Sequence, residues 1–226
     1  MRVAAARPTG MFLLFVPALL GGCLLPRASA QLARSASARS LAQSRYETLR
    51  TRVMASDLSV DWNELRQTAV DAGLEDGFDW HPVRQRVLRD LDAGNAQAAL
   101  GGAQTIIAHN MANPEGHLLA MMADQQLGQE PAADAEHNIV AAIVQSIMAS
   151  GDGFSEQRAL ATVSSSEEEF VVDMVLGADT ESQALVSRDG SSFDRRTIRG
   201  EDGSERVLWF RVITRPVTVA EVLPLR

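Results

Sequence analysis

The sequence has almost none of two residue types that carry much of protein chemistry. Of 226 residues one is a cysteine, Cys23, and none is a lysine, so all 21 basic residues are arginines. A single cysteine excludes a disulfide within the chain and metal sites built from several thiolates. The absence of lysine excludes a Schiff-base enzyme and the Gly-x-x-x-x-Gly-Lys phosphate loop. The stability of the fold must therefore come from a packed core, and both Schiff-base enzymes and enzymes with this phosphate loop are excluded.

Two further catalytic signatures are missing. No Gly-x-Ser-x-Gly elbow is present for a nucleophilic serine. His109, His117 and His137 do not form the pairs at i and i+4 that zinc proteases use. We therefore expect neither a metal nor another cofactor, and an enzyme is the less favoured class.

Residues 1–30 have the pattern of a signal peptide. Arg2 and Arg7 precede an apolar run over residues 11–25 that is short for a membrane span, and Ala28-Ser29-Ala30 fits signal peptidase I. The mature chain would then start at Gln31 and be periplasmic or secreted. Alternatively, Leu20-Gly21-Gly22-Cys23 resembles a lipobox, in which case Cys23 would carry a lipid anchor. A third alternative is an uncleaved anchor or a buried helix.

The charge of the mature chain disfavours nucleic acid as a partner. The first 30 residues hold three arginines and no acid, which leaves 18 − 29 = −11 for the remainder. Proteins that bind phosphate backbones carry the opposite sign. Residues 31–56 are locally basic; they are interpreted as a linker that runs into a solvated helical tail, with an amphipathic tether to an anionic surface as the alternative. Membrane attachment is otherwise expected only through a lipid on Cys23.

Residues 57–150 are predicted to be helical. Asp61 with Glu64 resembles a capping box that opens a helix ending near Ala72. Four helices follow in residues 82–150, with turns at Gly94 and Gly128, which are 34 residues apart. The same offset relates Ala99 to Ala133, Val87 to Met121, Leu88 to Met122, and Ile106 to Val140. This is the period of tetratricopeptide-like helical hairpins; an ordinary helical bundle is the alternative.

Residues 151–226 are predicted to form a small α+β region. A strand is expected at 159–163, and strands at 183–188, 193–199 and 207–213 are separated by short turns that favour antiparallel pairing. Ser166 with Glu169 resembles a second capping box, before a short helix expected to bury Phe170, Val171, Met174 and Val175. The fold class is therefore α+β, with tetratricopeptide-like hairpins followed by a small antiparallel sheet with one helix.

Five stretches between Asp61 and about Arg215 resemble a bacterial family catalogued as domain of unknown function 4919. They are Asn113–Leu119, Ser146–Gly153, Glu167–Phe170, Gln183–Ser187 and Leu208–Val212. The family commonly has tyrosine where Phe170 and Trp209 stand here, which argues against a chemical role for either position. The resemblance implies an exported protein with one family domain and implies no activity.

The join Ser150-Gly151-Asp152-Gly153 is the nearest approach to a site. Two glycines around an aspartate at a helix end could offer oxygens to a cation, or they could end the helix, with Gly151 as the left-handed cap and Asp152 capping the turn. His117 matches Val83 of the preceding unit, and His137 matches Ala103, so both are expected to be buried or half-buried. Glu167, Glu168 and Glu169 are interpreted as favourable charges at a helix N-terminus.

Two functions from different classes follow. The first is a non-enzymatic module of the cell envelope whose helical face binds a protein or peptide, through His117 or the junction Ser150, Gly151, Asp152 and Gly153. The second is an envelope hydrolase or other enzyme that uses Asp152 with His117 or His137 near this junction.

Overall fold

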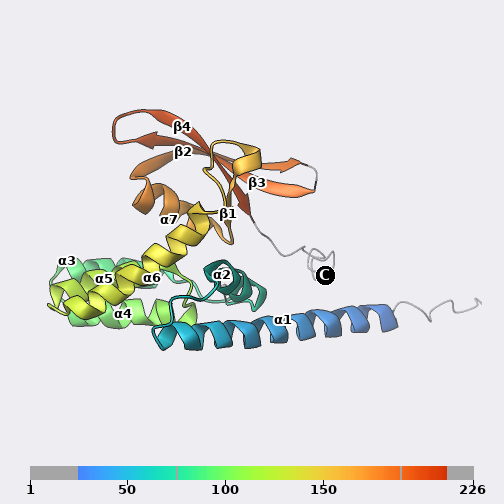
Figure 1. The fold of residues 1–226 in the computed structure, drawn as a ribbon, viewed down its shortest axis with the longest axis horizontal. Helices are drawn as coiled ribbons and strands as arrows, with labels where there is room; N and C mark the ends of the chain where they lie inside the picture. The colour runs from blue at the N-terminus through green and yellow to red at the C-terminus, as the bar shows by residue number, and fades with distance from the viewer. Residues whose placement is uncertain (1–24, 75, 189, 213–226) are drawn as a thin grey trace, which may run out of the picture. The chain divides into compact units, whose positions relative to one another are not determined.

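The computed structural model describes residues 25–74, 76–188 and 190–212 (Figure 1). The predicted signal peptide up to residue 24, with Cys23, lies outside the described residues. The chain divides into two compact units, Met1–Ser37 and Ala38–Arg226. All side-chain contacts discussed below belong to the second unit. Among the helices of residues 25–212, none is both long enough and apolar enough to cross a membrane.

The first described element is helix α1 (Leu25–Met54). The prediction of a linker at the start of residues 31–56 was wrong, because the backbone is helical from Leu25 onwards. No glycine or proline occurs between Gln31 and Met54, and alanine, arginine and leucine, which favour helices, are frequent there. Composition rich in Ser, Ala and Arg therefore does not mark a linker here.

Helix α2 (Trp62–Asp71) begins where the capping pattern predicts. The Asp61 carboxylate accepts a hydrogen bond from the backbone N–H of Glu64 at 2.9 Å. The Glu64 carboxylate instead accepts two bonds from the Arg45 guanidinium on α1, at 2.6 and 3.0 Å. The cap thus also ties α2 to α1.

Helices α3 (His81–Asp92), α4 (Ala96–His109), α5 (Pro114–Gln126) and α6 (Glu130–Met148) pack in sequence (Figure 1). Gly94 and Gly128 lie in the turns, with φ of +74° and +70°, where the lack of a Cβ avoids strain. Ala99 and Ala133, one repeat apart, are both buried. The bends therefore occur at the predicted offset, while membership of the tetratricopeptide class stays a prediction.

The C-terminal region contains a four-stranded sheet in the order β1-β4-β3-β2. After a 3-10 turn, η1 (Glu156–Arg158), the strands are β1 (Leu160–Thr162), β2 (Ala178–Arg188), β3 (Ser191–Gly200) and β4 (Glu205–Val212). The pairs β2–β3 and β3–β4 are antiparallel, as the short turns predict. The prediction of a wholly antiparallel sheet was wrong in one strand, since β1 pairs parallel with β4. The long excursion between these strands allows this parallel pairing. The α+β class is confirmed.

Helix α7 (Ser165–Phe170) lies between β1 and β2 and continues as a π-helical turn, η2 (Val171–Val175). Its cap is Ser164, whose hydroxyl accepts from the N–H of Glu167 at 3.3 Å, so the capping box predicted at Ser166 and Glu169 was wrong by two residues. Both serines precede a glutamate three residues later, and the sequence pattern alone does not choose between them.

The buried face of this segment also differs from the prediction. Val171 and Val172 are buried, whereas Met174 and Val175 are exposed. The π turn, closed by a bond from the N–H of Leu176 to the carbonyl of Val171, adds a residue to the turn and changes the direction of the side chains that follow. Apolar side chains that a regular helix would bury therefore face solvent.

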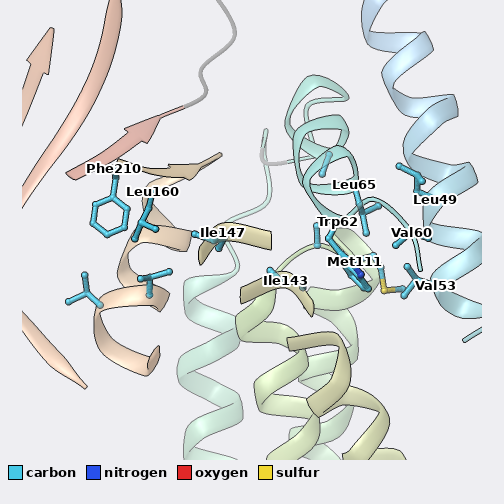
Figure 2. Packing of buried hydrophobic residues seen from close by; sticks show 14 of the residues in the cluster. Leu49, Val53, Val60, Trp62, Leu65, Met111, Ile143, Ile147, Leu160 and Phe210 are labelled. Atoms are coloured by element: carbon cyan, nitrogen blue, oxygen red, sulfur yellow. The ribbon is translucent and has the colours of Figure 1, made fainter. Parts of the chain in front are cut away.

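One hydrophobic core joins the helical and β regions. It contains residues of α1, α2, α6, η2 and all four strands of the sheet. In Figure 2, Ile147 of α6 lies between Leu160 and Phe210 of the sheet and Leu65 of α2. A second cluster, around Ala99 and Ala103, fills the interior of α3, α4 and α5. The helix α6 therefore carries the end of the helical region directly onto the sheet.

Candidate functional site

Ser150 follows the C-cap of α6 and attaches the end of this helix to the sheet. Its hydroxyl donates to the carbonyl of Ile147 at 2.6 Å and accepts from the N–H of Ala161 in β1 at 2.7 Å. The side chain is therefore engaged in structure rather than held ready as a nucleophile.

The two glycines of the junction have different roles from those predicted. The left-handed residue is Gly153, with φ of +75°, and Ala149 is the C-cap of α6, so the assignment of Gly151 as the left-handed cap was wrong. A Cβ on Gly151 would lie 2.2 Å from the carbonyl oxygen of Arg158. Glycine is needed at 151 because another backbone segment approaches closely, which a local sequence pattern does not reveal.

The Asp152 carboxylate is already engaged. One oxygen accepts from the N–H of Phe154 at 3.0 Å, which is the turn cap that the sequence predicts, and the other pairs with Arg158 at 2.7 Å. Among the side chains that the structure describes, no group of three or more acidic, histidine or cysteine residues is placed to hold a metal ion. Asp152 therefore stabilises the loop and forms part of a rim.

An open groove of about 780 Å³ lies beside this loop. Its floor is formed by Leu160 of β1, Ile198 of β3 and Leu208 of β4. One wall is the loop with Gly151, Asp152 and Phe154, and another is the end of η2 with the residues that follow it, Met174 to Ala178. The site thus contains two of the four predicted junction residues together with the end of the π turn.

The walls of this groove are unusually apolar for a solvent-exposed surface. The exposed fractions of Phe154, Met174 and Leu176 are 62%, 49% and 42%, and all three line the groove. Clustered exposed apolar side chains are typical of interaction surfaces, and methionine adapts to irregular partners. The groove is therefore suited to bind an apolar segment.

The rim at the β3–β4 turn is mainly acidic. Glu201, Asp202 and Arg206 line this end of the groove. Hydrogen bonds from Ser204, and secondarily the charge of Arg206, lower the pKa of Asp202, so this carboxylate is ionised at neutral pH. Arg158 neutralises the charge of Asp152. The other charged groups of the rim are the carboxylates of Glu201 and Asp202 and the guanidinium of Arg206, so the rim favours a ligand that carries a positive charge.

His117 lies far from this groove. It is buried at the start of α5, with Nδ1 2.5 Å from the Glu136 carboxylate and Nε2 2.9 Å from the carbonyl of Met111. Glu136 precedes the end of α6 at Met148 by 12 residues, which corresponds to about 18 Å of helix. The structure therefore does not bring His117 together with Asp152.

His137 and His109 offer no partner for Asp152 either. His137 is one residue from Glu136 on α6, and it is exposed, contrary to the prediction of a buried or half-buried position. His109 bonds through Nε2 with the carbonyl of Leu74, and its ring lies 4.2 Å from that of Phe78. The acid–base arrangement that an enzyme would need is not formed by these side chains.

Two buried ion pairs were missed by the sequence interpretation. Arg66 of α2 is fully buried and donates to both oxygens of Glu167, at 2.8 and 2.7 Å. The same guanidinium donates to the Ser146 hydroxyl on α6 and to the carbonyl of Ala161 in β1. This one side chain therefore connects α2, α6, β1 and α7, and Glu167 is not a solvated charge.

The adjacent Glu168 points to a different partner, Arg196 of β3. Arg196 donates to one Glu168 oxygen at 2.9 and 3.2 Å, and the hydroxyl of Thr162 bonds with the other oxygen at 3.2 Å. Burial, together with the neighbouring Asp194 carboxylate, raises the pKa of Glu168 to about 7. Asp194 Oδ1 is buried with no hydrogen-bond partner among the described residues.

No family model, no curated protein and no solved structure matches this chain. The resemblance to domain of unknown function 4919 therefore stays a prediction from the five stretches of sequence.

Proposed function

We propose that this chain is an exported, non-enzymatic binding module of the cell envelope, and that its groove holds an apolar segment of a protein or peptide partner. The supporting observation is the exposure of Phe154, Met174 and Leu176 around an open groove of about 780 Å³. Burying such side chains contributes about 25 cal/mol per Å² of apolar surface removed from water. The acidic rim at Glu201 and Asp202 favours a segment with a basic residue beside its apolar part.

This proposal moves the partner from the helical face to the groove. The exposed large apolar side chains of the described residues lie on α1, in the loop before α2, in the Gly153–Ser155 loop, on η2 and on β2. None of them belongs to α3, α4, α5 or α6. The helical array therefore serves as support for the sheet, to which α6 and Arg66 attach it.

The envelope hydrolase is the less favoured alternative. Asp152 is bound to Arg158, and His117 is about 18 Å of helix away from the junction, so no general acid–base pair is in place. No observation in the groove favours a reacting group over a binding contact.

The proposal is tested with short fluorescein-labelled peptides that carry two apolar anchors and one arginine, by fluorescence polarisation. We expect binding that Met174→Asp weakens about tenfold or more, because a charge would be placed on the apolar wall. Leu41→Asp is the matched control, since Leu41 on α1 is also an exposed apolar residue, at 73%, and its change should leave the affinity unaltered.

The proposed role of the acidic rim is tested separately, by changing the charge of the peptide. Replacing the arginine of the peptide by glutamate should weaken binding to the unchanged protein. If no peptide of the library binds, or if Met174→Asp binds as tightly as the unchanged protein, the groove is not the partner site.

A further inference from the structure

The strand β2 is the outer strand of the sheet and has an open edge. It pairs with β3 on one side, and no strand of the described residues lies on its other side. Most of its side chains are exposed on both faces, and Leu185 is exposed by 73%. A long edge of this kind presents unpaired backbone N–H and C=O groups to solvent.

The regular part of this strand is residues 182–188, called the β2 edge here. A bulge between Thr180 and Ser182 interrupts the register with β3, and pairing is continuous from Ser182 to Arg188. The β2 edge contains one charged residue, Arg188, and neither lysine nor proline. The features that normally prevent edge-to-edge pairing are therefore largely missing from it.

The direction of the backbone groups follows from the turn. The closing pair Arg188 and Ser191 leaves two residues between the strands, and in such hairpins the closing pair exchanges hydrogen bonds. Because the pattern alternates along an antiparallel pair, Gln183, Leu185 and Ser187 turn their N–H and C=O groups outward. Leu185 is the middle residue both of the β2 edge and of this outward set.

We propose that the β2 edge pairs with the β2 edge of a second copy of this chain, antiparallel, about a two-fold axis at Leu185. Leu185 then lies opposite the partner's Leu185, and Gln183 lies opposite the partner's Ser187, so all outward groups meet in about six hydrogen bonds. Within each chain Arg188 pairs with Glu156 and Glu181 pairs with Arg199, both at 2.6 Å, so the proposed pairing does not depend on these charges. The interface is instead formed by the outward backbone groups and the two Leu185 side chains, which the two-fold axis relates to each other.

Sedimentation velocity across a micromolar concentration series tests this pairing. We expect a monomer–dimer equilibrium for the unchanged protein, and a dimer Kd raised about tenfold or more by Leu185→Lys, which places like charges opposite each other. Leu41→Lys is the matched control, because Leu41 has the same exposed fraction of 73% and lies on α1. Its Kd should equal that of the unchanged protein.

Cross-linking gives a second readout that tolerates a weak dimer. In a Cys23→Ser background, Leu185→Cys should form a disulfide-linked dimer on mild oxidation, since Cα atoms of paired residues lie about 5.5 Å apart. Leu41→Cys should not. A protein that stays monomeric throughout and does not cross-link at 185, or a Leu185→Lys variant that dimerises normally, overturns the proposal.

Discussion

At the scale of single residues, the centre of this molecule is ionic rather than purely apolar. Glu167 and Glu168 are adjacent on α7, and each carboxylate is buried against a different arginine, Arg66 or Arg196. Breaking one such pair leaves an uncompensated charge in the interior, which costs about 3–5 kcal/mol. These pairs are better regarded as a requirement for correct assembly than as a large net gain in stability.

The raised pKa of Glu168 predicts a pH dependence of stability. The carboxyl holds its proton up to about pH 7 in the folded protein but only to its ordinary pKa of 4.5 when unfolded. The folded state therefore binds more protons between these values. The stabilisation is complete below pH 4.5 and is lost as the pH rises towards 7, by about 1.4 kcal/mol per pH unit at most.

Denaturant unfolding at pH 5 and pH 8 measures this effect. We expect the free energy of unfolding to fall by about 1–3 kcal/mol between the two, and Glu168→Gln to remove most of that fall. Glu169→Gln is the control, because Glu169 is exposed and its change should keep the fall intact. An equal fall in the Glu168→Gln variant would contradict the assignment.

At the scale of elements, the sequence predicted correctly the features that are set by neighbouring residues, and it failed for those that depend on contacts between distant residues. The turns at Gly94 and Gly128 and the cap at Asp61 are set by neighbouring residues, and the sequence located them correctly. The buried glutamates were not recognisable, because Glu167 meets a residue 101 positions away. Without a sequence signal for the π turn, a regular 3.6-residue period placed Met174 in the core.

The candidate groove was predicted only in part for the same reason. Gly151 and Asp152 belong to a recognisable junction, but Ile198 and Leu208 of its floor come from strands that follow much later. On the wall, Leu176 lies outside the apolar stripe of its helix and could have signalled the groove, whereas Met174 fits that stripe and was placed in the core.

Gly151 gives a prediction at this scale. Gly151→Ala should destabilise the protein by about 1–3 kcal/mol, since the added Cβ would lie 2.2 Å from the carbonyl oxygen of Arg158. Gly101→Ala, in the interior of α4 with open space around it, should stabilise by about 0.5–1 kcal/mol. Chemical denaturation compares the two, and an equal effect of both changes would show that backbone approach at 151 is unimportant.

At the scale of the whole molecule, the predicted signal peptide leads to a testable expectation about the compartment in which the groove operates. We expect expression in a bacterial host to yield an exported protein whose intact mass corresponds to a start at Gln31. Cys23→Ser should then leave both processing and location unchanged. A mass that includes a lipid on Cys23 would instead assign the chain to the membrane surface as a lipoprotein.

The arrangement of α7 also limits how this chain can be divided. A fragment that stops after Ser150 keeps the guanidinium of Arg66 but not its carboxylate, and a fragment that begins at Gly151 keeps Glu167 without its counterion. In either fragment, a buried charged side chain would be left without its counterion. Gene fusions, domain exchanges and proteolytic dissection that separate residue 66 from residue 167 should therefore yield insoluble products. Evolution is therefore expected to transmit the helical and β regions as a single inherited unit.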